Sequence, residues 1–159
     1  MVKNKPEVKI VKDNSNRILI DIGNQSEEVV QAVADHGADL ITQGLEKHGK
    51  INTGLTLNEI KVVNHKDHVS IECGGAMSWI EFGRPPGIMP PVEPIQRWAE
   101  LKGLIDKRKK GERGTVSSSA WAIAKGIEKN GIKPTPIVRN AVQELKVDAP
   151  KIIKEFRGG

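Results

Sequence analysis

The sequence contains one cysteine and no tyrosine, and its other large aromatic residues are three Trp and two Phe. With Cys73 alone, an intramolecular disulfide and a zinc cluster built on several thiolates are both excluded, and a reducing compartment fits best. Aliphatic side chains must therefore fill the core. No run approaches the ~18 apolar residues of a membrane span, and residues 1–6 have no apolar run behind their lysines. We expect no membrane contact and no signal peptide.

The length and charge of the chain limit the number of domains and the kind of partner that we expect. A chain of 159 residues has the size of one compact domain. Its net charge of +5 is unevenly distributed, because residues 1–79 carry 9 basic and 11 acidic side chains whereas residues 80–159 carry 16 and 9. This asymmetry favours a negatively charged neighbour for one face, either nucleic acid or an acidic protein surface.

The first part of the chain has a strand pattern followed by a helix pattern. Apolar stretches at 8–12 and 17–22 predict two short strands joined by a polar turn, or alternatively a flexible arm with one strand. Asn24 is a suitable N-cap for a helix that runs to about Lys47, because apolar residues then recur at spacings of three and four.

Two glycines lie near the apolar stripe of this predicted helix. Gly37 and Gly44 are seven residues apart, and each costs roughly 1 kcal/mol relative to alanine in a helix interior. We therefore expect another segment to approach closely at both positions. That segment is either a strand or helix of the same chain or a neighbouring copy in an oligomer.

Alternating apolar and polar residues dominate the stretch from 51 to 82. The alternation predicts an antiparallel hairpin with one face on the core and its turn at 64–67. Gly74 and Gly75 break the second strand, and residues 77–82 are expected to form a further aromatic strand. The long helix is the natural cover for the apolar face of these strands.

Most of the prolines lie in the second half of the chain. Residues 83–91 hold four prolines and two glycines, which predicts an ordered, extended loop that is neither helix nor central strand. The run from 106 to 114 is basic and has no apolar residue, which predicts an exposed loop. Helices are predicted from Pro94 to about Leu101, from 115–117 to Asn130, and from Pro136 past Leu145, with a restart or kink at 148–150 before a last turn or two.

These patterns predict an α+β fold in which an antiparallel β-sheet is packed by the long N-terminal helix, with two or three further helices in the C-terminal half. We expect a single domain over 1–159 with a flexible arm at about 1–7, an exposed basic loop at about 104–114 and a frayed C-terminal tail. Trp98 and Trp121 occupy apolar helix faces and are predicted core anchors. Trp79 is the exception, because its place before the proline loop also suits a subunit contact.

Few residues have the types and spacing that catalysis requires. His65 and His68 form an H-x-x-H pair around Asp67, but they fall in the predicted hairpin turn without a third ligand. Cys73 is interpreted as a small apolar side chain, and the serines at 117–119 as a helix start. We expect no enzyme activity, no metal and no cofactor.

The segment from Met77 to Ala99 runs from an aromatic stretch ending in Glu-Phe-Gly through a Pro/Gly loop to a short helix with Trp98. It resembles the central motif of the neck or tail-completion proteins of long-tailed bacteriophages, the group that includes minor tail protein Z. The resemblance continues through residues 120–127, 130–136 and 139–141, and spans about Glu27 to Leu145. It implies a non-enzymatic virion protein that assembles into a ring between portal and tail, through which DNA passes, and that is made in the cytoplasm of the host bacterium.

Two groups of residues are candidate contacts in such a ring. For the contact between subunits the hypothesis names Trp79, Glu81, Phe82, Arg84, Pro85, Pro86 and Met89. For the lumen, DNA or an adjacent ring it names Lys107, Arg108, Lys109, Lys110 and Arg113, since mobile cations can contact phosphates. Expected partners are further copies of the chain and portal-side, connector, tail-terminator or tail-tube proteins. The alternatives are a small basic DNA-binding protein that uses the C-terminal half, and, with less support, a hydrolase built on His65, His68 and Asp67.

Overall fold

The computed structural model describes residues 9–12, 17–21, 23, 25–51, 54–105 and 117–158. They form two compact units, each with its own cluster of buried apolar side chains. We call residues 1–81 with 135–159 the sheet unit, and residues 82–134 the helical unit. The expected arm at 1–7 and basic residues at 106–114 lie outside the described residues.

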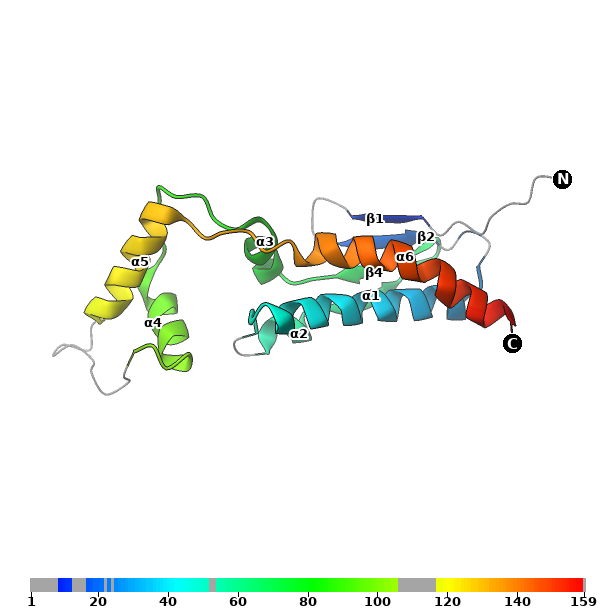
Figure 1. Ribbon diagram of the computed structural model, residues 1–159, viewed down its shortest axis with the longest axis horizontal. Coiled ribbons are helices and arrows are strands. Elements are labelled where there is room, and N and C mark those ends of the chain that lie inside the picture. Colours follow the sequence, from blue (N-terminus) through cyan, green and yellow to red (C-terminus); the bar gives the residue numbers. More distant parts are fainter. Residues whose placement is uncertain are drawn as a thin grey trace. The chain divides into compact units, whose positions relative to one another are not determined.

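The sheet unit is an antiparallel sheet with two long helices on one face (Figure 1). Its four strands are paired in the order β1-β2-β4-β3, and every neighbouring pair is antiparallel. The strands are β1 (Ile10–Lys12), β2 (Ile18–Asp21), β3 (Lys61–Asn64) and β4 (His68–Glu72). The helices of this unit are α1 (Glu27–Lys47), the single turn α2 (Leu55–Asn58), α3 (Gly75–Phe82, whose last residue begins the helical unit) and α6 (Ile137–Gly158). This arrangement confirms the predicted α+β fold.

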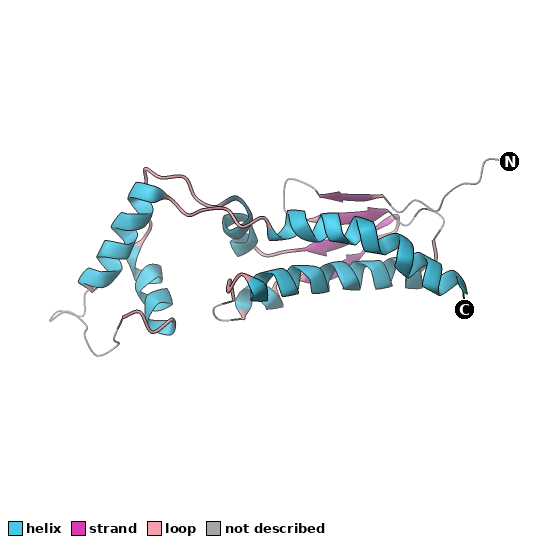
Figure 2. Ribbon diagram, in the orientation of Figure 1, coloured by secondary structure: helices cyan, strands magenta, loops and turns pink. Residues whose placement is uncertain are grey.

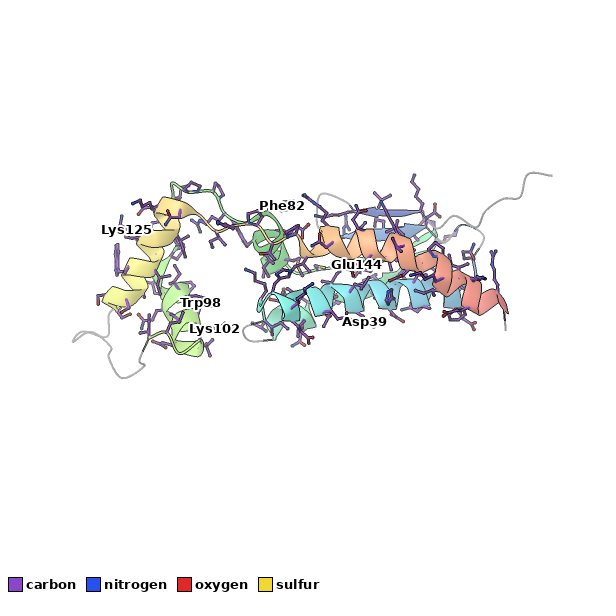
Figure 3. The ribbon with its side chains drawn as sticks, viewed as in Figure 1. Asp39, Phe82, Trp98, Lys102, Lys125 and Glu144 are labelled. Carbon is purple, nitrogen blue, oxygen red and sulfur yellow. The ribbon has the colours of Figure 1, made fainter. Side chains whose placement is uncertain are left out.

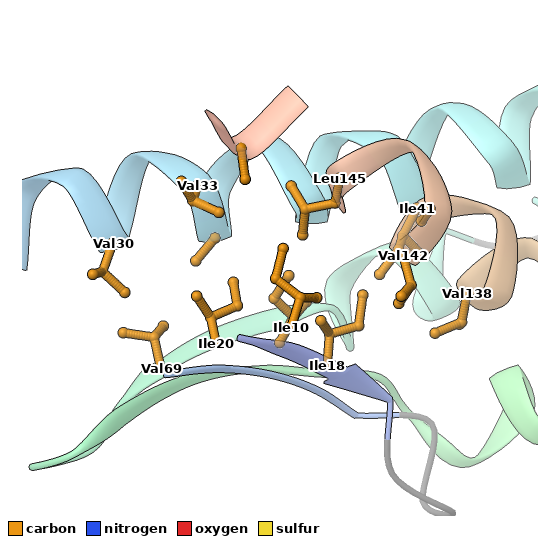
Figure 4. Packing of buried hydrophobic residues seen from close by; sticks show 14 of the residues in the cluster. Ile10, Ile18, Ile20, Val30, Val33, Ile41, Val69, Val138, Val142 and Leu145 are labelled. Carbon is orange, nitrogen blue, oxygen red and sulfur yellow. The ribbon is translucent and has the colours of Figure 1, made fainter. Parts of the chain in front are cut away.

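The core of the sheet unit lies between the sheet and the helix pair α1 and α6 (Figure 4). The register places Ile18 opposite Ile71 and Ile20 opposite Val69, so that alternate residues of both strands enter the core. Helix α1 supplies the facing layer at positions three and four apart, and α6 packs alongside it. The buried residues labelled in Figure 4 are Ile10, Ile18, Ile20, Val30, Val33, Ile41, Val69, Val138, Val142 and Leu145.

The two glycines of α1 are explained within the chain. A Cβ at Gly37 would lie 2.6 Å from Ile71 Cδ1 and 2.9 Å from Leu145 Cδ2, and a Cβ at Gly44 would lie 2.6 Å from Ile137 Cγ2. The sheet and α6 therefore approach α1 closely at these positions, as the first of the two interpretations expects.

Several predictions of local structure are corrected. Residues 77–82 belong to helix α3 and not to a strand, because Met77 and Glu81 lie on the buried face four residues apart while Trp79 points outward. The alternating pattern at 55–58 is a helical turn. At the C-terminus, α6 continues through Pro150 to Gly158, so of the two alternatives at 148–150 the restart is wrong.

The helical unit is a pair of helices (Figure 2). Helix α4 (Val92–Leu101) packs against helix α5 (Ser118–Asn130), and three of the five buried side chains of this unit are alanines. The buried set is Val92, Ala99, Ile105, Ala120 and Ala124. Ser117 caps α5 by accepting a hydrogen bond from the Ala120 backbone N–H at 3.2 Å, and the helix ends at Gly131 as predicted.

Candidate association surface

The Pro/Gly loop at 83–91 is anchored by backbone hydrogen bonds to the segment that follows α5. Arg84 and Ile132 exchange both backbone bonds, with N···O distances of 2.9 and 2.8 Å. Gly83 and Gly131 have φ angles of +70° and +69°, and a Cβ on either would strike the opposite backbone. Outside this bridge the loop is neither helix nor strand, which confirms the prediction for these residues.

Several large apolar side chains of the helical unit are exposed. Trp98 and Trp121, predicted as core anchors, are 40% and 46% exposed, so that prediction is wrong for the chain alone. Figure 3 labels Trp98 on α4. The buried cluster of this unit is instead made of Val92, Ala99, Ile105, Ala120 and Ala124, with Met89, Ile95 and Ile123 packed against it. The other exposed apolar residues of this unit are Phe82, Ile88, Leu101, Leu104 and Ile132.

The residues named for a subunit contact fall into three classes of exposure. Trp79 on α3 is 62% exposed, and Phe82, Pro85 and Pro86 are also exposed. Arg84 and Met89 are half-buried, and Met89 packs against the cluster of the helical unit. Glu81 is buried, with 1% of its surface exposed. The sheet unit contains Trp79 and Glu81, and the helical unit contains the other five.

The Glu81 carboxylate binds the beginning of α6 and the strand β1. Its Oε2 accepts a hydrogen bond from the Val138 backbone N–H at 2.8 Å, and its Oε1 accepts one from the Arg139 N–H at 3.1 Å. Lys12 Nζ donates to Oε1 at 2.7 Å. The carboxylate thus satisfies two of the N–H groups that a helix start leaves without partners, and its negative charge faces the positive end of the helix dipole. Its role in the structure is internal, and we omit it from the contact surface proposed below.

Of the H-x-x-H pair, His65 lies in the turn between β3 and β4, and His68 is the first residue of β4. Their rings stack with centroids 4.3 Å apart. His65 Nε2 lies 3.1 Å from Ser70 Oγ, and His68 Nδ1 lies 2.8 Å from Asp67 Oδ1. The bond from His68 lowers the pKa of Asp67. No group of three or more His, Cys, Asp or Glu side chains suited to a metal ion occurs in the described part of the chain.

Two further features of the sheet unit bear on chemistry, the Cys73 thiol and a pocket beside α1. Burial raises the pKa of the Cys73 thiol to about 11, which keeps it protonated and unreactive near neutral pH. A pocket of about 330 Å³ lies beside the start of α1 and the histidine turn. Its lining residues are Glu27, Glu28, Gln31, Asn64, His65 and Val69.

A polar contact joins α1 to α6 at the surface of the sheet unit. Asp148 Oδ1 accepts a hydrogen bond from Lys151 Nζ at 2.7 Å, and Asp148 Oδ2 lies 3.2 Å from His36 Nε2. The bonds from Lys151 and then His36 lower the pKa of the Asp148 carboxyl. This carboxyl is therefore ionised over a wider pH range in the folded chain than in the unfolded one.

No family model, curated protein or solved structure matches the chain. Across the residues that the structure describes, none of the helices has the length and apolar character needed to cross a bilayer.

The sequence analysis missed most of the exposed apolar residues on α4. Pro94, Trp98 and Leu101 recur at spacings of four and three, which is a helix face. Val92 and Ala99 form the opposite, buried face. Because both faces of α4 are apolar, periodicity alone could not indicate which of them meets α5. The basic residues at 107–110 and 113 lie outside the described residues.

Proposed function

We propose that this chain is a structural virion protein of a tailed bacteriophage, a subunit of the head–tail connector ring through which DNA passes. The observation that supports this proposal most is the exposure of large apolar side chains within the motif at 77–99. Trp79, Phe82, Ile88 and Trp98 all belong to that motif, and all are at least 40% exposed. Large apolar side chains exposed to solvent are typical of surfaces that contact other proteins.

The anchored loop is a second argument for a contact surface. Backbone bonds between Arg84 and Ile132 anchor the loop, and the side chains of Pro85, Pro86 and Ile88 remain exposed. A rigid apolar loop loses little conformational entropy when it binds a neighbour. Such rigid surfaces suit the head-to-tail contacts that build a closed ring.

The test is to locate the chain in particles. Mass spectrometry of purified virions should detect the protein, and imaging should place it at the neck. Deleting its gene from the phage or prophage is expected to give separate heads and tails that no longer join. Particles that lack this chain yet join heads to tails and infect normally would overturn the proposal.

A pair of surface variants connects the proposal to the exposed motif. Ile88→Ser with Trp98→Ser should leave the helical content unchanged and prevent incorporation into particles. The matched control is Leu55→Ser with Val147→Ser, because these two residues are also apolar, are each 64% exposed and lie outside the motif. We expect the control to be incorporated normally. Equal incorporation of both double variants would contradict a role of the motif in assembly.

The second candidate function is a small basic DNA-binding protein, and the charge of the helical unit favours it. Residues 82–134 carry 11 basic and 5 acidic side chains. Binding of duplex DNA by the isolated protein, weakening steeply as salt increases, would support this candidate. Binding that is undetectable at low salt would dispose of it.

A further inference from the structure

The outward face of α5 combines an aromatic side chain, a shallow notch and positive charge. Trp121, Lys125 and Lys129 are spaced four apart along the exposed side of the helix, and Figure 3 labels Lys125 there. Ala122 and Gly126 lie beside them and are also exposed. A Cβ built at Gly126 would meet nothing within 4 Å, unlike those at the glycines of α1. Nothing within the described part of the helical unit therefore requires a glycine here.

The outward face of α1 is acidic along its whole length. Glu28, Asp35, Asp39 and Glu46 are spaced by seven, four and seven residues, which places them in one line along the helix opposite the core. All four are exposed, and none has an ion-pair partner among the described residues. Figure 3 labels Asp39 on this side of α1. The line is about 27 Å long at the rise of an α-helix.

The two faces are complementary in charge and in spacing. Asp35 and Asp39 are four residues apart, as are Lys125 and Lys129, so both pairs have a separation of about 6 Å along their helix axes. We propose that the α5 face of one copy of this chain docks on the acidic α1 face of the next copy. This inference rests on the proposed function and names the surfaces through which neighbouring subunits meet. The contact is head-to-tail, as ring closure requires.

A second copy fits the α5 face better than DNA does. Lys125 is paired with Glu128 at 2.7 Å along the helix, an exposed pair that a partner's carboxylate can replace at little cost. The notch at Ala122 and Gly126 admits a close helix, whereas phosphate contact needs only cations. DNA binding at this face is one of the outcomes that the experiment distinguishes.

The experiment exchanges charges between the two faces. Asp35→Lys with Asp39→Lys makes both faces basic, and Lys125→Glu with Lys129→Glu makes both acidic. Association is measured by sedimentation in about 50 mM salt, where exposed charges interact strongly, and again in about 500 mM salt. The wild-type chain should associate at low salt and weaken at high salt. Each double variant alone should associate at least tenfold more weakly.

Mixing the two double variants is the decisive step. Each variant then meets an oppositely charged face on the other, so the mixture should regain association to within about threefold of the wild type. The control variants, Lys146→Glu with Lys154→Glu and Glu144→Lys with Glu155→Lys, change the net charge equally on exposed positions of α6. They should associate as the wild type does.

An uncharged variant tests the same contact by shape. Gly126→Leu places a large side chain in the notch, where the chain itself offers no obstacle, and should weaken association at least tenfold while circular dichroism stays unchanged. Circular dichroism on every variant verifies that the fold is retained.

Four results would overturn the inference. The first is a wild-type chain that stays monomeric at low salt, and the second is association that none of the three variants weakens. The third is a Lys125 and Lys129 variant that loses binding of duplex DNA but still associates. The fourth is association that recovers only when all four charge reversals are placed in one chain. The last would mean that the two faces meet within a chain. None of these results determines whether the protein is present in virions, so locating the chain in particles still tests the proposed function separately.

Discussion

Replacing Glu81 with alanine is expected to lower the free energy of unfolding by about 3–5 kcal/mol. The carboxylate is buried and accepts three hydrogen bonds, two from backbone N–H groups at the start of α6 and one from Lys12. Removing it leaves two backbone N–H groups at the start of α6 without this acceptor and removes one partner of Lys12, whose side chain is 18% exposed. Each lost partner contributes about 1–3 kcal/mol, although such losses are not additive.

Urea unfolding followed by far-ultraviolet circular dichroism measures this loss. Glu128→Ala is the matched control, because Glu128 also pairs with a lysine at 2.7 Å but lies on the surface of α5. We expect the control to change stability by less than about 1 kcal/mol. Glu81→Gln should fall between the two, since the amide keeps one acceptor oxygen and loses the charge. Lys12→Met should cost less than Glu81→Ala, because the carboxylate keeps its two backbone donors.

The reasoning is refuted if Glu81→Ala costs less than about 1 kcal/mol or no more than Glu128→Ala. Either result would mean that water or a rearranged side chain replaces the carboxylate at the start of α6. A double-variant cycle on Lys12 and Glu81 then separates the ion pair from the capping of the helix.

Three further predictions concern the packing, the thiol and the pH dependence. Gly37→Ala should destabilise the chain by about 1–3 kcal/mol because its Cβ meets side chains of the core, whereas Gly126→Ala should stabilise it by about 0.5–1 kcal/mol. Urea unfolding measures both changes in the free energy of unfolding, and the same sign for both variants would contradict the packing at Gly37. Cys73 should react with a thiol reagent at pH 8 about a hundredfold more slowly in the folded chain than in urea, since its pKa rises from 9.0 to about 11; equal rates would show that the thiol is exposed. Asp148 has a lowered pKa, so its contribution to stability is present above the unfolded value of 3.8 and is lost as the pH falls from 3.8 through the lower folded value. The stability of Asp148→Asn, followed by thermal unfolding, should therefore depend less on pH as the pH falls below 3.8, and an unchanged pH profile would argue against the bonds to this carboxyl.

The periodicity of the sequence predicted the sheet unit well because there one face of each element is apolar and the other polar. In β2 the buried residues Ile18 and Ile20 alternate with less buried neighbours, and the apolar residues of α1 recur at helical spacing. Each pattern has one solution with a consistent buried face. The long helix was accordingly predicted with nearly the observed bounds, and so was the turn of the hairpin, whereas the hairpin strands are shorter than the alternating stretch indicated.

Residues 77–82 were assigned to the wrong element because their pattern allows two periods. Alternation groups Met77, Trp79 and Glu81 on one strand face, whereas helical spacing groups Met77 with Glu81 and leaves Trp79 outside. The structure has the second grouping. The deciding contacts are the bonds from Glu81 to Lys12 and to the start of α6, which are 69 and 57 residues away in the sequence. Local pattern carries no information about partners so distant.

The tryptophans of the helical unit mislead for a different reason. A large apolar side chain on a helix is normally covered by the same chain, and this rule placed Trp98 and Trp121 in the core. The contact between α4 and α5 instead buries Ala99, Ala120 and Ala124, whose side chains contribute little burial each. On the proposed function, the area missing from this small core is supplied by a neighbouring subunit, and burial of each indole would stabilise the assembly by about 1.5–3 kcal/mol. A helix face that is covered by its own chain and one that is covered by a neighbouring subunit then have the same hydrophobic pattern in the sequence, and only the molecule that covers the face differs.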